Sequence, residues 1–193
     1  MAFVDAIFTF KVELNIPHRR IGESVLFKVP KFSVESVAGF YARVLTYLHC
    51  YQPDLQWCKE HYHKKLPTLY LEDEIGQLQS WIEVGCPEKR KIELALRLPR
   101  CHSVCVYLWN SEDVDHFCQF LKGSRSNWIE PVEFYRIDEA FLGDLPALST
   151  TRVNWSLTVV DDMCYLTVEQ SEFVTEIAPF DIWAQFQTVI AND

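Results

Sequence analysis

The chain has 193 residues, of which 49% are hydrophobic and 23% are charged. These shares are typical of a globular protein and exclude a disordered chain, and the length suits one domain over residues 1–193. No apolar run approaches the roughly 20 residues of a membrane-spanning helix, so we expect no membrane partner.

Charge is distributed unevenly along the chain, whose formal net charge is -9. Residues 1–100 carry 14 Lys and Arg against 12 Asp and Glu, a net of +2, whereas residues 101–193 carry 4 against 15, a net of -11. The basic residues cluster at Lys59–Lys65 and Lys89–Arg100, so an anionic ligand such as nucleic acid is expected there. The commoner explanation of such clusters is a solvated face on an acidic protein.

The seven cysteines predict reduced thiols and a cytoplasmic protein. Their number is odd, and several lie in apolar stretches such as residues 101–109. Residues 1–14 alternate polar and apolar residues like a strand and do not resemble an export signal. We therefore expect no intramolecular disulfide.

Two strands and a helix are expected at the start of the chain. Alternation predicts strands over residues 5–15 and 23–29, with a turn at Pro17–Gly22 that makes a hairpin. Ser33 is expected to cap the helix that follows, because apolar residues then recur at helical spacing. A short second helix is expected over Pro53–Glu60.

The middle of the chain is expected to alternate strands and helices. Residues 68–73 and 77–84 predict a tight antiparallel pair of strands. Pro87 is expected to begin a helix, and the apolar run over residues 103–109 predicts a strand covered on both faces. A helix should then extend from its cap at Ser111 to Gly123.

The last third is expected to be mainly β-structure. A strand over residues 128–135 and a short helix from Asp138 come first. From Arg152 to Ile177 alternation predicts a three-stranded meander with a turn at Asp161–Asp162. The hairpins at both ends of the chain are expected to pair as one antiparallel sheet, and the middle to form an α/β core of about four strands.

The chain contains the stretch Trp81-Ile-Glu-Val-Gly85, followed by Pro87-Glu-Lys-Arg-Lys-Ile92. This stretch resembles the signature of the YaeQ family of bacterial proteins. The first helix, with Glu35 and Arg43 in step, and the strand at residues 105–110 are also similar to the family. The resemblance covers most of the chain. It implies an α/β fold with a restriction-endonuclease-like core, as in the PD-(D/E)XK superfamily, and no established activity.

The resemblance also implies which residues would form a nuclease-like site. In that superfamily, carboxylates at adjacent strand ends hold a divalent cation, and a nearby Lys stabilises charge. Mg²⁺ would suit such a site because it prefers oxygen ligands and activates water for attack on phosphorus. The resemblance therefore implies that Glu83 is the metal ligand and a catalytic residue, with Arg90 or Lys91 as the catalytic cation. Glu35 is a further expected member of the cofactor-binding set.

The remaining positions of that site are not acidic in this sequence. Thr68 and Gln79 stand where similar proteins carry acidic residues, and both belong to the expected cofactor-binding set. Gln79 and Glu83 are four residues apart on a strand, so they share a face. A carboxamide adds no negative charge to a metal site. Unless Glu72 or Glu74 compensates, we expect weak nuclease activity or none.

Each candidate has a plainer explanation. Glu83 could be a strand-end carboxylate paired with Arg90, Lys91 or Arg43, and the basic run at 89–91 could be a solvated helix face. The other candidate residues are two small clusters: His61 with His63, and Cys101 with His102 and Cys105. The first is more typical of a surface loop than of a metal site, and the second lacks the second ligand pair of a zinc site.

Three functional hypotheses follow. The first is a non-catalytic or catalytically weakened protein that binds nucleic acid or a protein partner through its basic first half. The second is a Mg²⁺-dependent nuclease or phosphodiesterase. The third is a regulatory protein-interaction module whose acidic second half meets a basic partner. The oligomeric state is left open.

Overall fold

The computed structural model describes residues 2–122 and 128–192, without the side chains of residues 189–192. The chain forms two compact units. Unit 1 comprises Met1–Tyr51, Lys59–His61 and Ile137–Ala178, and unit 2 comprises Gln52–Cys58, Tyr62–Arg136 and Pro179–Asp193. The expectation of a single domain stays a prediction. Gly123, the expected end of a helix, lies outside the described residues.

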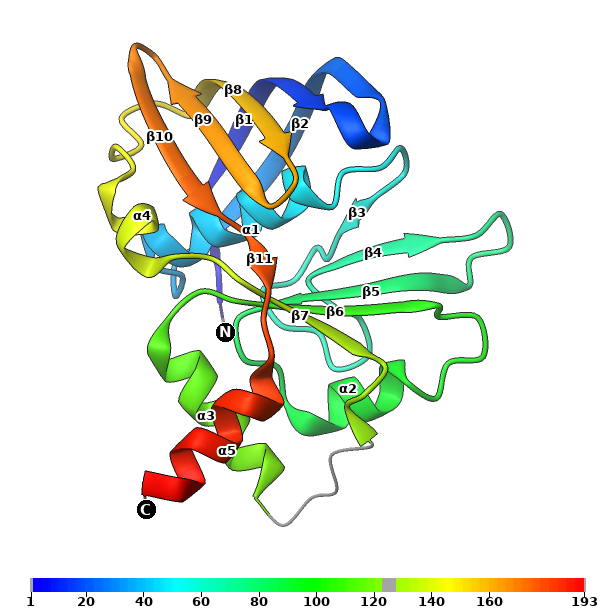
Figure 1. Cartoon of the computed structure of the whole chain (residues 1–193). Helices are drawn as coiled ribbons and strands as arrows, with labels where there is room; N and C mark the ends of the chain where they lie inside the picture. Colours follow the sequence, from blue (N-terminus) through cyan, green and yellow to red (C-terminus); the bar gives the residue numbers. More distant parts are fainter. Residues whose placement is uncertain (1, 123–127, 193) are drawn as a thin grey trace. The chain divides into compact units, whose positions relative to one another are not determined.

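Unit 1 contains a five-stranded sheet with the order β10-β9-β8-β1-β2 (Figure 1). Its strands are β1 (Val4–Ile16), β2 (Ile21–Phe32), β8 (Arg152–Val160), β9 (Met163–Val168) and β10 (Ser171–Glu176). The strands from both ends of the chain share one sheet, as predicted. The sheet is mixed, however, because β1 and β8 run parallel, with Val12 opposite Trp155. The expectation of a purely antiparallel sheet is wrong, since the long connection between β2 and β8 permits either direction.

The helices of unit 1 are the 3₁₀-helix η1 (Pro17–Arg19), α1 (Val37–His49) and α4 (Glu139–Asp144). α1 packs on the sheet, with the ring of Phe40 5.1 Å from that of Phe8. Its N-cap is Ser36, whose hydroxyl accepts a hydrogen bond from the Gly39 amide at 3.0 Å. The predicted cap, Ser33, accepts instead from the amide of Phe3. The prediction placed the cap one turn too early.

Unit 2 contains a six-stranded sheet with the order β11-β7-β6-β5-β4-β3. Its strands are β3 (Gln56–Trp57), β4 (Leu69–Glu72), β5 (Leu78–Val84), β6 (Ser103–Leu108), β7 (Val132–Arg136) and β11 (Ala178–Pro179). β5, β6 and β7 are parallel, and β4 pairs antiparallel with β5. The predicted helix over residues 53–60 is wrong. Asp54 has a left-handed backbone with φ 71°, which is incompatible with a helix, and β3 follows.

Three helices, α2 (Lys89–Ala95), α3 (Ser111–Leu121) and α5 (Ile182–Asn192), cover one face of this sheet (Figure 1). The core between them includes Trp81, Val106 and Phe117. α2 begins after Pro87 and spans seven residues, and the side chain of Asn110, rather than Ser111, caps α3. α5 was not predicted.

The expected mixed α/β architecture is thus present in the described residues. No helix in residues 2–122 or 128–192 is long and apolar enough to cross a membrane. All seven cysteines are described, and each is a free thiol.

Candidate functional site

Glu83 is a buried carboxylate in unit 2, on the face of β5 that packs against α2. Trp81 lies two residues earlier on the same face. Trp81 is fully buried, and Glu83 exposes 3% of its surface. Burial of an ionised carboxylate is unfavourable unless charged or hydrogen-bonding partners compensate. The neighbours of Glu83 therefore decide what its carboxylate can do.

Three donors surround the Glu83 carboxylate. The Lys91 ammonium lies 2.7 Å from Oε1, and the Trp81 indole Nε1 donates to the same oxygen at 3.0 Å. The Thr68 hydroxyl donates to Oε2 at 3.2 Å. These donors come from β5 itself, from α2 and from the residue before β4. The ion pair between Glu83 and Lys91 therefore also connects β5 to α2 within unit 2.

Burial raises the pKa of Glu83 above its ordinary value. The charge of Lys91 and the hydrogen bonds from Lys91, Trp81 and Thr68 oppose that rise. The carboxylate is thus stabilised by its immediate partners and destabilised by its exclusion from water.

Of the two expected basic partners, Lys91 contacts Glu83, and Arg90 lies elsewhere. Lys91 is only 4% exposed, and its ammonium lies 5.2 Å from the ring centre of Tyr62. Arg90 is largely exposed and forms an ion pair with Glu88, which also accepts a hydrogen bond from the Tyr62 hydroxyl. Lys91 is therefore part of an internal pair and is not available to a phosphate at the surface.

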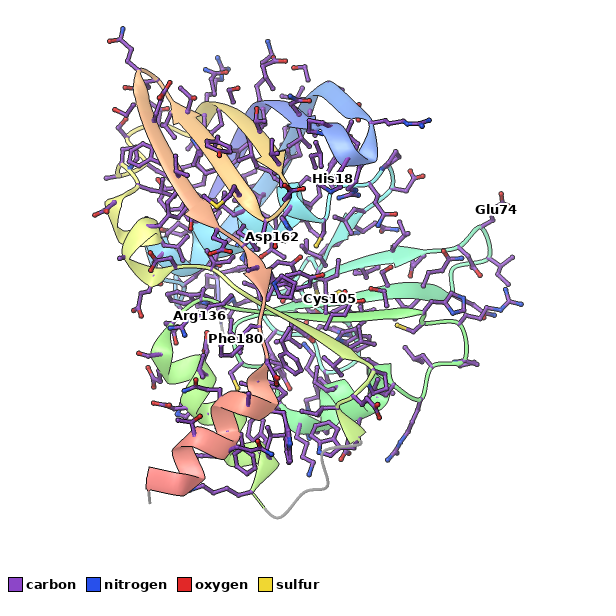
Figure 2. The ribbon with its side chains drawn as sticks, viewed as in Figure 1. His18, Glu74, Cys105, Arg136, Asp162 and Phe180 are labelled. Carbon is purple, nitrogen blue, oxygen red and sulfur yellow. The ribbon has the colours of Figure 1, made fainter. Side chains whose placement is uncertain are left out.

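The other expected members of the set do not complete a metal site around Glu83. Gln79 is on β5, where its backbone carbonyl accepts a hydrogen bond from the His102 amide. Glu72 accepts a hydrogen bond from Gln56, and Glu74 lies at the turn between β4 and β5 (Figure 2). Neither Glu72 nor Glu74 compensates for the missing acidic residues.

The residues present do not fit a resident Mg²⁺. The ion needs several oxygen atoms that offer lone pairs, whereas Glu83 is surrounded by an ammonium, an indole N–H and a hydroxyl. Among the described residues, no group of three or more His, Cys, Asp or Glu side chains could hold a metal ion. His61 and His63 are therefore not part of such a group. His61 packs on the ring of Phe32, and the His63 ring accepts a hydrogen bond from the Lys65 amide.

Glu35 belongs to unit 1, where it forms a second buried ion pair. Arg43 Nε lies 2.5 Å from Glu35 Oε1, and Arg43 Nη2 lies 2.8 Å from Oε2. The same Nη2 donates to the carbonyl of Pro30 at 2.6 Å. The rings of Phe32 and Phe40 flank the guanidinium at 5.3 and 5.6 Å. Of the three partners expected for Glu83, Lys91 forms the ion pair, whereas Arg43 pairs with Glu35.

The family described as YaeQ protein matches residues 1–177 of the chain. The chain belongs to the YaeQ family. No curated protein matches the chain.

Two solved YaeQ structures share the fold. The YaeQ protein from Xanthomonas axonopodis pv. citri has a TM-score of 0.78 at 11% identity, covering 90% of this chain and 96% of that one. The YaeQ protein from Pseudomonas syringae has a TM-score of 0.77 at 17% identity, covering 91% of this chain and 96% of that one. At these identities the comparison shows that this YaeQ-family chain has the family's fold.

Sequence reasoning missed Trp81 and Tyr62 as neighbours of the ion pair. The signal for Trp81 was available, because a residue two positions before Glu83 on a strand must share its face. Tyr62 carried no such signal, since it lies in a loop separated from α2 by two strands.

Proposed function

We propose that this YaeQ-family chain is a non-catalytic protein-interaction module built on a restriction-endonuclease-like core. The parallel strands β5, β6 and β7 with helices on one face support that core. One observation supports the proposal that the chain is non-catalytic. The Glu83 carboxylate is buried, and its oxygens are already paired with donors from Lys91, Trp81 and Thr68.

Metal-dependent phosphodiester hydrolysis requires a carboxylate that can bind a cation and then meet phosphate and water. At Glu83 the position of that cation is held by the Lys91 ammonium, 2.7 Å from Oε1. Thr68 contributes a neutral hydroxyl where a second carboxylate would be needed. The pair therefore links β5 to α2 within unit 2 and does not bind substrate.

A protein partner is favoured over nucleic acid for two reasons. Lys91 is buried and Arg90 is paired with Glu88, which removes two of the cations expected to contact phosphate. The chain also carries a net charge of -9, which repels a polyanion. Lys64 and Lys65 are exposed and belong to the basic cluster Lys59–Lys65 that a nucleic-acid hypothesis would use.

A nuclease assay tests the loss of catalysis. The purified chain is incubated with single- and double-stranded DNA and RNA in Mg²⁺ or Mn²⁺, and we expect no cleavage. The matched variant is Glu83→Gln, which keeps the side-chain shape and removes the charge. Cleavage by the wild type that disappears in this variant would make the chain a nuclease. Cleavage retained at the same rate in both identifies a contaminating enzyme.

A second experiment asks whether the missing carboxylate alone prevents metal binding. Thr68→Asp restores an acidic group beside Glu83. We expect it to lower stability, because two carboxylates then share one buried site, and to produce no Mg²⁺ binding by titration calorimetry. Saturable Mg²⁺ binding by Thr68→Asp would show that the site is a metal site lacking one ligand.

Fluorescence anisotropy with a labelled oligonucleotide tests the nucleic-acid alternative. We expect no binding even at low salt, where phosphate contacts are strongest. Binding that weakens with salt and is lost in the double variant Lys64→Ala and Lys65→Ala would favour nucleic acid over a protein partner.

A further inference from the structure

A groove lies in unit 2 along the outer edge of β7 and the start of α5. Its volume is about 780 Å³, and its lining comes from residues 129–135 and 179–183. This volume is within the range of about 300–1,000 Å³ that is typical of ligand sites. The groove is formed by elements that do not carry Glu83 or Lys91, so it is distinct from the buried ion pair.

The floor and walls of the groove are apolar. Val132, Phe134 and Ile182 are buried and form part of the unit 2 core, so the floor is held in place by packing. Phe180 and Trp183 line the groove and are only half-buried. Two partly exposed aromatic rings beside a rigid apolar floor are typical of sites that receive a large apolar side chain.

The edge of the sheet is only lightly covered at this groove. β7 has five residues, and among the described residues the strand on its outer side is β11, which has two. The Phe180 amide donates to the Phe134 carbonyl at 2.7 Å, which fixes the chain as it turns into α5. The Arg136 guanidinium lies 5.6 Å from the centre of the Phe180 ring. Figure 2 labels both residues. The aromatic wall is thus positioned by contacts within unit 2.

The charged residues that line the groove are Glu130, Glu133 and Asp181, and all three are acidic and exposed. Glu133 Oε2 accepts a hydrogen bond from the Tyr135 hydroxyl, and Asp181 Oδ1 accepts from the Ala184 amide at the start of α5. These bonds hold two of the carboxylates in place but do not neutralise them. The charged lining residues are therefore all acidic around an apolar floor, and Arg136 is a cation beside them, against the ring of Phe180.

We propose that this groove binds a segment of a partner protein in which a large apolar side chain is flanked by Lys or Arg. The apolar side chain would pack between Phe180 and Trp183, and the flanking cations would pair with the acidic rim. A polyanion is repelled by the same three carboxylates. The proposal rests on the proposed function as a protein-interaction module and names the chemistry of the partner.

Peptide selection tests the proposal while the partner itself is still unidentified. A phage-displayed library of random twelve-residue peptides is selected on the immobilised full chain, and the winners are synthesised with a fluorescent label. We expect sequences in which Trp, Phe, Leu or Ile stands beside Lys or Arg. Affinity is then measured by anisotropy for the wild type and for the variants.

Three matched variants locate the binding. The charge variant combines Glu130→Gln, Glu133→Gln and Asp181→Asn, which removes three charges and keeps the hydrogen-bond acceptors. The apolar variant is Phe180→Ala. The control removes three charges from exposed positions of unit 1: Asp144→Asn, Glu172→Gln and Glu176→Gln. Circular dichroism and thermal unfolding of all three confirm that they fold.

We expect the charge variant and Phe180→Ala each to weaken binding by about tenfold or more, and the control to bind like the wild type. Two results would contradict binding of a partner segment in the groove. Either no peptide is selected, or the selected peptides bind the charge variant and Phe180→Ala as tightly as the wild type. In the second case a protein-interaction function survives at another surface. Dimerisation of the wild type that the charge variant abolishes would instead identify the occupant as a second copy of the chain. A failure of the proposed loss of catalysis appears separately, as cleavage that depends on Glu83.

Discussion

Among the described residues, a glutamate and a cation on a helix form a buried ion pair in each unit, and the two pairs are built differently. In unit 1, Arg43 contacts both oxygens of Glu35 and lies over the rings of Phe32 and Phe40. In unit 2, Lys91 meets one oxygen of Glu83, and Trp81 and Thr68 supply the other hydrogen bonds. The planar guanidinium can donate to both oxygens of a carboxylate by itself. An ammonium contacts one oxygen here, so further donors are needed for the other hydrogen bonds.

The difference shows how Glu83 and Lys91, the residues of the expected site, form an internal ion pair in unit 2. A carboxylate and an ammonium are residue types that metal-dependent catalysis uses. Here the Glu83 carboxylate instead contacts three donors of the chain itself: Lys91, Trp81 and Thr68. The two pairs also differ in their response to loss of a partner. A buried carboxylate can take up a proton, whereas a guanidinium cannot lose one in water.

The largest effect is expected in unit 1. Glu35→Ala leaves the Arg43 guanidinium buried without its anion, and we expect a loss of about 3–5 kcal/mol in the free energy of unfolding. Arg43→Lys should also be destabilising, because one ammonium cannot reach both carboxylate oxygens and the Pro30 carbonyl. Urea unfolding measures both, with exposed Glu172→Ala as a control of no more than about 0.5 kcal/mol. A cost for Glu35→Ala as small as the control would mean that the pair contributes nothing to folding.

A somewhat smaller effect is expected for the pair in unit 2. Lys91→Met should cost about 3 kcal/mol, at the lower end for a broken buried pair, because Glu83 can take up a proton. The double variant Glu83→Leu and Lys91→Met removes both charges and should recover most of that loss in urea unfolding. A double variant as unstable as Lys91→Met alone would contradict a purely electrostatic cost.

Acid should act on the two units with opposite signs. His49, at the end of α1, has its pKa lowered to about 4, first by burial and then by the charge of Arg19, while Asp162 opposes the change. In the unfolded chain the His49 imidazole therefore takes up a proton near pH 6.5, whereas in the folded chain it stays neutral until the pH falls to about 4. The stability due to neutral His49 is complete above pH 6.5 and is lost as the pH falls toward 4. We expect roughly 2–3 kcal/mol, allowing for partial exposure of the ring.

The raised pKa of Glu83 has the reverse effect, because its contribution to stability is greatest at low pH and is lost as the pH rises through the folded pKa. Unfolding free energies measured from pH 4 to 7 separate the two. His49→Gln should flatten the decrease between pH 6.5 and 4, whereas Glu83→Gln removes the opposing contribution and should leave the decrease at least as steep. An unchanged slope in His49→Gln would assign the acid sensitivity to another group.

Elements with a regular pattern could be predicted from the sequence. The tertiary packing that buries Glu83 and Lys91 could not. Alternation located β1, β2 and the β8–β10 meander, since a half-buried strand imposes period two. The direction of β8 beside β1 depends on a connection of more than a hundred residues, which carries no local signal. The presence of Glu83 and Lys91 could be recognised, but the burial that closes them depends on Trp81 and on packing of α2 against β5. The groove beside α5 was missed because its helix was not predicted.

The smallest expected effect concerns the helices that carry the two cations. α1 begins at Ser36, whose hydroxyl caps the Gly39 amide, whereas α2 begins after Glu88, which makes no side-chain cap. Ser36→Ala should therefore cost about 1 kcal/mol in thermal or urea unfolding. Glu88→Ala removes only exposed contacts with Arg90 and Tyr62, and its effect should be smaller than that of Ser36→Ala. Ser33→Ala is the matched serine control, since its bond to the Phe3 amide is exposed and long at 3.3 Å. If Ser33→Ala were the more costly of the two serine changes, the start of α1 would lie one turn earlier, and the pairing of Arg43 with Glu35 across that turn would need a different geometry.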